Sequence, residues 1–194
     1  LHAIRPARQS GVWHGSMGKP AAATVLRNGA RHLRLMSVLP RADLAKSATV
    51  DGLAYDMLAQ AGHALRARGL AFSDVVRTWI FVQDIERNYR FLNQARNRYY
   101  AEQKLTRLPA STGVEGTVAG ASVPIAMDLY AIGPSEDVRV SAIPAGAMGE
   151  ASAYGSAFAR GSHIREPGRS TLYVSGTASI DARGRVVAAG DIDG

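Results

Sequence analysis

One predicted helix carries a stripe of side chains that suit the binding of an acid. Residues 86–103 have helical periodicity, and four of them fall at i, i+4, i+7 and i+11 on one face: Tyr89, Asn93, Arg96 and Tyr100. A guanidinium group holds a carboxylate through two parallel hydrogen bonds, so Arg96 is a candidate substrate-binding residue and Tyr100 would shape the adjacent wall. The alternative is a solvated helix face.

A predicted strand, residues 75–82, adds a second cation. The segment is β-branched and aromatic, and strict alternation places Val75, Arg77, Trp79 and Phe81 on one face and Val76, Thr78, Ile80 and Val82 on the other. Arg77 and Trp79 would line a ligand cleft. The alternative for this pair is a salt bridge and a packed ring at a subunit interface.

A short segment after the second helix offers hydroxyls and a carboxylate. Ser111, Thr112 and the backbone of Gly113 are candidates for an oxyanion or carboxylate nest, or else belong to an ordinary strand turn. Glu115 is a candidate general acid or base, with an exposed strand-end carboxylate as the alternative.

Metal and cofactor chemistry is not indicated. The chain has no cysteine, its five histidines lack metal-ligand spacing, and it contains neither a P-loop nor a dinucleotide fingerprint. We therefore expect no metal site and no cofactor.

Composition indicates a globular chain outside the membrane. There is no apolar run long enough to span a bilayer, and the first residues are not a signal peptide, so the chain is expected to be cytoplasmic and to begin inside a longer gene product. The net charge is +7, but the 20 Arg and 3 Lys are scattered. Nucleic acid is therefore the less favoured partner, while acidic small molecules suit the arginine bias.

The remaining patterns complete an α+β unit. Residues 24–38 form a hairpin about Asn28-Gly29, Asp51 is the expected N-cap of a helix that ends before Gly69, and residues 123–132 form the last strand. A mixed sheet with both helices on one face leaves its other face bare, and self-association is the simplest cover.

The same unit begins a second time. Leu172-Tyr173-Val174-Ser175-Gly176-Thr177 repeats the character of Leu33-Arg34-Leu35-Met36-Ser37-Val38, but no second long helix follows. We expect residues 157–160 to open its first strand, residues 171–177 to form the returning strand, and residues 181–184 to form a turn. The predicted divisions are an irregular lead-in (1–23), a complete domain (24–132), a linker (133–153) and an incomplete second unit (154–194).

Four motifs along the complete domain form a familiar pattern: Ser73-Asp74-Val75-Val76-Arg77-Thr78, Val82-Gln83-Asp84-Ile85, Arg98-Tyr99-Tyr100 and Pro109-Ala110-Ser111-Thr112. The pattern resembles the RidA/YjgF/UK114 superfamily, also called endoribonuclease L-PSP-like. The resemblance implies a chorismate-mutase-like sandwich and homotrimers with clefts at subunit or domain contacts.

Further strings resemble the tandem branch of that superfamily, which includes the chorismatases: Leu108 to Gly116, Tyr154 to Arg160 and Ser175 to Ile180. This resemblance implies that Arg96 and Arg160 contact substrate carboxylates and that Asp128 corresponds to the family's acidic residue on the last strand. The deaminase members carry an arginine where this chain has Ala110, and the region in which chorismatases keep their acid is not in this chain.

Three hypotheses follow. The first is a hydrolytic or lyase enzyme acting on a small carboxylated metabolite, chorismatase-like in architecture, with Asp128 or Glu115 transferring protons. The second is a non-catalytic ligand-binding or scaffolding homologue. The third is an enamine or imine deaminase, or an endoribonuclease that inhibits translation.

Overall fold

A computed structural model describes residues 11–13, 20–45, 48–116, 123–145, 151 and 155–176. Its first sheet has six strands in the order β1-β2-β3-β6-β4-β5, in which only β4 and β5 are parallel neighbours. These strands are β1 (Gly11–Trp13), β2 (Ala21–Arg27), β3 (Ala30–Val38), β4 (Val75–Val82), β5 (Ala110–Glu115) and β6 (Ile125–Ile132). The predicted fold class is confirmed.

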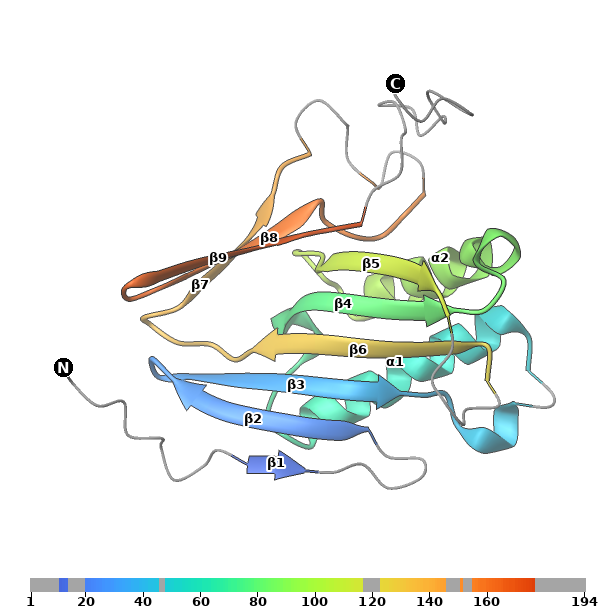
Figure 1. The fold of residues 1–194 in the computed structure, drawn as a ribbon, viewed down its shortest axis with the longest axis horizontal. Helices are drawn as coiled ribbons and strands as arrows, with labels where there is room; N and C mark the ends of the chain where they lie inside the picture. The colour runs from blue at the N-terminus through green and yellow to red at the C-terminus, as the bar shows by residue number, and fades with distance from the viewer. Residues whose placement is uncertain are drawn as a thin grey trace.

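Helices α1 (Val50–Arg66) and α2 (Ile85–Glu102) lie together on one face of this sheet (Figure 1). Two short 3-10 turns, Ala42–Leu44 and Phe72–Asp74, precede α1 and β4. The main core fills the space between the helices and the sheet, where Leu33, Leu35, Met57, Leu58 and Leu92 are completely buried. Burial of this apolar surface is what holds the helices on the sheet.

Two turn predictions are confirmed by backbone geometry. Asn28 and Gly29 have φ values of 49° and 68°, as a two-residue type I′ hairpin turn requires. Gly69 has a φ of 69°, and the Leu70 amide donates to the Leu65 carbonyl at 3.1 Å, which ends α1 in a Schellman-type cap.

The predicted helix cap was off by two residues. The hydroxyl of Thr49, not Asp51, accepts a hydrogen bond from the amide of Gly52 at the start of α1. Asp51 lies in the first helical turn, where its carboxylate forms an ion pair with Arg98 at 3.1 Å. A carboxylate there also interacts favourably with the helix dipole, which is why the two positions are hard to tell apart.

Strict alternation along β4 was also wrong at its first two residues. The pairing of β4 with β6 shifts between Val75 and Arg77. This bulge places Val75 in the core under the helices and Val76 in a second cluster on the opposite face. An extra residue in a bulge inverts the alternation locally, so sequence periodicity does not reveal it.

The second sheet consists of β7 (Arg139–Ile143), β8 (Gly161–Glu166) and β9 (Arg169–Val174), all antiparallel. Its hairpin begins at Gly161, so the expectation of a first strand at 157–160 was wrong. Ala159 forms only an isolated bridge, to Ala110 on the edge strand β5. The predicted turn at 181–184 lies outside the described residues, and the predicted domain boundaries stay a prediction.

The second sheet covers one end of the face that the helices leave bare. Ile164 and Tyr173 pack against Val76, Tyr130 and Ile132 in a second apolar cluster. The chain therefore covers part of its own bare face. Within the described residues, no helix is long and apolar enough to cross a membrane.

Candidate functional site

The predicted binding residues gather around β5, the edge strand of the large sheet. Neighbouring side chains of a strand point to opposite faces, so Ser111 points toward α2 and Thr112 toward the face that carries Arg77. The sequence brings both cations to this edge, one on each side of the strand.

On the helix side, Arg96 is the side chain that organises the polar contacts. It is 1% exposed, and its Nη1 donates to the Ser111 hydroxyl at 3.2 Å, while its Nη2 donates to Asn93 Oδ1 at 2.5 Å. Thr78 also donates to Ser111, at 2.9 Å. Since the Ser111 oxygen accepts both hydrogen bonds, its own proton is available to an acceptor in the neighbouring space.

On the other side of the strand, Arg77 is buried beside Thr112. Its guanidinium donates to the Thr112 hydroxyl and, at 3.0 Å, to the carbonyl of Val174. It also lies 5.1 Å from the centre of the Trp79 ring. Burial lowers the pKa of Arg77, although an arginine remains charged at any physiological pH.

Neither buried arginine has an acidic partner in the described part of the chain. No ion pair there involves Arg77 or Arg96, and the Nε atoms of both groups are buried without a hydrogen-bond partner. Burying a cation without a counter-charge is costly, so this edge of the sheet is electrostatically suited to an anion.

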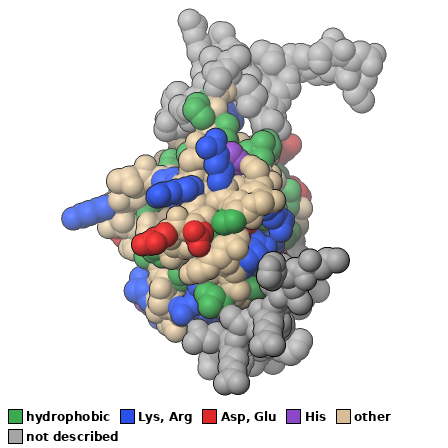
Figure 2. Space-filling model, turned by 90° about the vertical axis from the view of Figure 1, so that its left-hand side faces the viewer, with side chains coloured by type: hydrophobic (Ala, Val, Ile, Leu, Met, Phe, Trp, Pro, Cys, Tyr) green, Lys and Arg blue, Asp and Glu red, His purple; other side chains and the backbone are tan. Residues whose placement is uncertain are grey.

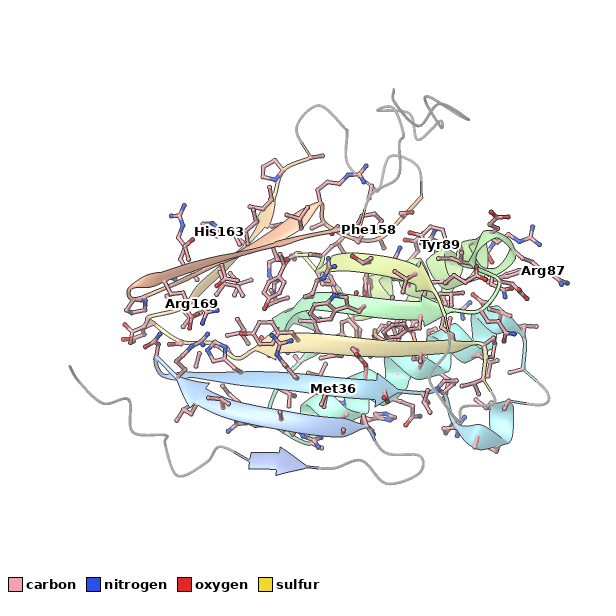
Figure 3. The ribbon with its side chains drawn as sticks, in the orientation of Figure 1. Met36, Arg87, Tyr89, Phe158, His163 and Arg169 are labelled. Carbon is pink, nitrogen blue, oxygen red and sulfur yellow. The ribbon has the colours of Figure 1, made fainter. Side chains whose placement is uncertain are left out.

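A cleft of about 510 Å³ opens at this point. Its lining comes from the start of α2, from β5 and from the end of the second sheet: Ile85, Glu86, Tyr89, Ser111, Thr112, Gly113 and Gly176. Figure 3 shows Tyr89 and Phe158 beside the β5 edge. A Cβ on Gly113 would lie 3.2 Å from the Tyr89 ring, so this glycine allows the ring to approach the strand closely.

Residues 174–176 close one side of the cleft. The amide of Gly176 donates to the Ser111 carbonyl at 3.1 Å and to the Thr112 hydroxyl at 2.9 Å. The Ser111 amide in turn donates to Ser175 Oγ at 2.9 Å. A Cβ on Gly176 would lie 2.7 Å from the Thr112 methyl group, so only glycine fits.

Two further predicted residues, Tyr100 and Arg160, lie near Arg96. The guanidinium of Arg96 is 5.3 Å from the centre of the Phe158 ring, and that of Arg160 is 5.7 Å from it. Tyr100 is buried, and its hydroxyl has no hydrogen-bond partner within the described residues. Burial raises the pKa of Tyr100 to about 12, so the hydroxyl keeps its proton.

Neither of the two predicted proton-transfer residues, Glu115 and Asp128, is part of the cleft lining. Glu115 Oε2 accepts a hydrogen bond from the Ile85 amide at 3.1 Å, at the start of α2. Asp128 Oδ1 accepts one from the Ser37 amide at 2.7 Å, in a separate hollow beside Trp79. Each carboxylate therefore has a structural contact, and their catalytic roles stay predictions.

Sequence reasoning did not select four residues of the cleft: Ile85, Glu86, Tyr89 and Gly176. Glu86 supplies the carboxylate that lines it, Tyr89 supplies a ring, and Gly176 supplies an amide. Tyr89 belongs to the polar stripe of α2, which was a usable signal. Glu86 had none, since an acid in the first turn of a helix is ordinary.

The six-stranded mixed sheet with two helices on one face defines an α+β protein of the chorismate-mutase-like architecture. Residues 39–132 match the family described as endoribonuclease L-PSP. This stretch, a little under half of the chain, is therefore similar to the superfamily that the sequence motifs resemble.

Solved structures support the same fold at low identity. A Salmonella typhimurium protein, named as a candidate translation initiation inhibitor, has 15% identity and a TM-score of 0.51 and covers 63% of this chain and 96% of its own. A YjgF-family protein from Neisseria meningitidis has 17% identity and a TM-score of 0.51, covering 66% of this chain and 97% of its own. No curated protein matches the sequence significantly. These similarities show that the fold is shared.

Proposed function

We propose that this RidA-superfamily protein binds a small carboxylated metabolite in the cleft beside β5 and acts on it by hydrolytic or lyase chemistry, with a chorismatase-like architecture. The observation that carries the proposal is the pair of buried arginines, Arg77 and Arg96, that have no acidic partner in the described part of the chain. A ligand carboxylate is the simplest group that would compensate them.

Each arginine acts through a hydroxyl at the cleft surface. Arg96 donates to Ser111, and Arg77 donates to Thr112, so both hydroxyls are polarised toward a bound anion. The Tyr89 ring provides an apolar wall, and Glu86, which lines the same cleft, is the candidate to exchange a proton with the ligand or with water. In this proposal Glu86 takes the role that the sequence suggested for Glu115 or Asp128.

To test the proposal, the purified protein is titrated with chorismate, pyruvate and a 2-aminoacrylate-type imine. Calorimetry measures binding, and product analysis measures turnover. Arg96→Gln and Ser111→Ala are expected to weaken carboxylate binding at least tenfold. Arg98→Gln is the matched control, because Arg98 lies on the same helix but is half exposed and pairs with Asp51. Equal binding by Arg96→Gln and the wild type would rule out this site.

Imine deamination is disfavoured by what surrounds Ala110. The position at which deaminases carry an arginine is fully buried here, and its amide donates to Ser162 Oγ at 3.1 Å on the second sheet. A guanidinium would not fit without displacing β8. This observation favours the non-catalytic ligand-binding homologue as the second candidate. Binding of the carboxylates without turnover would support that candidate, and turnover of any of them would exclude it.

The distribution of positive charge on the surface gives ribonuclease activity less support than it gives the binding of a small acid. Figure 2 shows Lys and Arg side chains in several separate places on one face, among side chains of other types. Such a distribution does not form a continuous track for a phosphate backbone.

Self-association through the uncovered part of the bare sheet face completes the proposal. Met36 and Val114 are each 40% exposed there, beside the partly exposed rings of Trp79 and Phe81. An apolar strip of this kind is typical of an interface, and a homotrimer is the assembly that the family resemblance implies. Light scattering on the wild type and on Met36→Lys tests it: a monomeric wild type would refute the proposal.

A further inference from the structure

The β8–β9 hairpin is held at its turn by a buried carboxylate. Glu166, the last residue of β8, has a side chain that is 1% exposed. Arg27 at the end of β2 binds it in a bidentate manner, with Nε 2.8 Å from Oε1 and Nη2 2.7 Å from Oε2. Two parallel charge-assisted hydrogen bonds fix both the distance and the orientation of the two elements.

Other groups of the β2–β3 hairpin complete this contact. Asn28 Nδ2 lies 3.4 Å from Glu166 Oε1, and His32 Nε2 lies 3.5 Å from the same oxygen. His32 Nδ1 is 2.6 Å from the hydroxyl of Tyr130 on β6. Through its carboxylate, Glu166 therefore joins the β8–β9 turn to the end of β2, the β2–β3 turn and β3 of the first sheet.

The opposite end of the same hairpin forms the cleft. Beyond the last residue of β9, Ser175 and Gly176 bond to Ser111 and Thr112, while the Val174 carbonyl receives Arg77. Between the two ends, Tyr173 packs edge-on against Trp79 with 6.2 Å between ring centres. The hairpin thus runs across the bare face from the β2–β3 turn to the β5 edge (Figure 1).

We propose that Glu166 is a positioning residue for the cleft. It fixes the turn of the hairpin, and the paired strands β8 and β9 transmit that position to Ser175 and Gly176, whose contacts set the width of the cleft and hold the Thr112 hydroxyl. The inference rests on the proposed function for its ligand, but the mechanical link from Glu166 to Gly176 does not depend on any ligand.

The experiment has one arm without ligand and one with it. In the first, amide hydrogen exchange of the Ser111 and Gly176 amides is measured in the wild type, in Glu166→Gln and in Glu136→Gln, an exposed acid that serves as the matched control. Glu166→Gln keeps the size of the side chain but removes its charge. We expect at least tenfold faster exchange at both amides, with no change in the control.

In the second arm, the dissociation constant for pyruvate is expected to rise about tenfold in Glu166→Gln and to recover partly in Glu166→Asp. A merely structural role would accelerate exchange around Arg27 and leave the amides of Ser111 and Gly176 and the dissociation constant unchanged, which would overturn the proposal.

Two further outcomes are separable. If wild-type protein binds no carboxylate, the proposed function fails, while the exchange arm still decides whether Glu166 positions the cleft. If Glu166→Gln does not fold, Asn28→Gly replaces it, since glycine tolerates the φ of 49° at this turn and the change removes the longest hydrogen bond to Glu166. Unchanged exchange at Gly176 in both Asn28→Gly and Glu166→Asp would then refute the link.

Discussion

At the scale of single residues, burial decides which polar groups are informative. Arg77 and Arg96 are as buried as core leucines, yet the described part of the chain offers them hydroxyls and carbonyls rather than carboxylates. Exposed Arg98, two residues from Arg96, has an acidic partner. The contrast distinguishes an exposed arginine that is paired with a carboxylate from two buried arginines that have no acidic partner in the described part of the chain.

Two buried tyrosines are expected to respond oppositely to loss of their hydroxyls. Tyr130→Phe removes the 2.6 Å contact with His32 and should lower the free energy of unfolding by about 1–2 kcal/mol. Tyr100→Phe removes a hydroxyl without a partner in the described residues and should leave stability unchanged or raise it by about 1 kcal/mol. Urea denaturation of both variants measures the difference, and a larger loss for Tyr100→Phe would contradict this view of the site.

His32 is expected to make stability depend on pH. Burial, with the charge of Arg27, lowers its pKa from 6.5, while Glu166 acts in the opposite direction and Arg169 adds to the lowering. His32 therefore takes up a proton more readily in the unfolded chain than in the folded chain. The free energy of unfolding should fall as the pH drops below about 6.5.

The measurement is urea denaturation between pH 5 and 8 for the wild type, His32→Gln and His63→Gln. The slope of stability against pH should flatten in His32→Gln. It should persist in His63→Gln, whose histidine is exposed on α1. An unchanged slope in His32→Gln would show that other groups produce the dependence.

At the scale of elements, the sequence predicted turns and helix ends well where neighbouring residues allow only one backbone conformation. The Asn28-Gly29 turn, the Gly69 cap and the helix predicted at residues 86–103 all appear as expected, because each depends on neighbours in the chain. The bulge at Val75 and the extended run before Gly161 did not, since both are set by pairing with distant strands. Part of the cleft lining was missed for the same reason, because three separate elements contribute to it.

Helix α2 depends on a distant cap. Its own N-cap residue, Asp84, has a φ of 48° and makes no side-chain capping bond, whereas Glu115 accepts the Ile85 amide. Glu115→Ala should therefore lower the free energy of unfolding by about 1 kcal/mol, as loss of an N-cap does elsewhere. Glu115→Gln keeps an acceptor and should cost less. Thermal denaturation measures both, and equal stability of Glu115→Ala and wild type would remove the capping role.

At the scale of the whole molecule, two apolar clusters lie on opposite faces of one sheet. The first is closed by α1 and α2, and the second by the β7–β9 sheet. This division suggests that the second sheet can be loosened while the helical core stays intact, because the clusters share strands but not side chains.

Ile164→Ala tests that division. Ile164 is fully enclosed in the second cluster, so its truncation should cost about 2–4 kcal/mol, expressed as faster hydrogen exchange in β8 and β9 but not in α1. Leu172→Ala is the matched control on the same hairpin, since Leu172 is 55% exposed and its loss should cost less than about 0.5 kcal/mol. Equal acceleration in α1 would mean that the two sheets unfold as one unit.

The hydrogen bonds that close one side of the cleft also cover part of the open edge of the large sheet. An edge strand normally presents unpaired amides and carbonyls that recruit strands from other molecules into aggregates. Along β5, Ala110 is bridged to Ala159, while the Ser111 amide and carbonyl are taken up by Ser175 and Gly176. The segment that closes the cleft thereby occupies hydrogen-bonding groups that strand addition would need, so the shape of the cleft and the protection of this sheet edge depend on the same few hydrogen bonds.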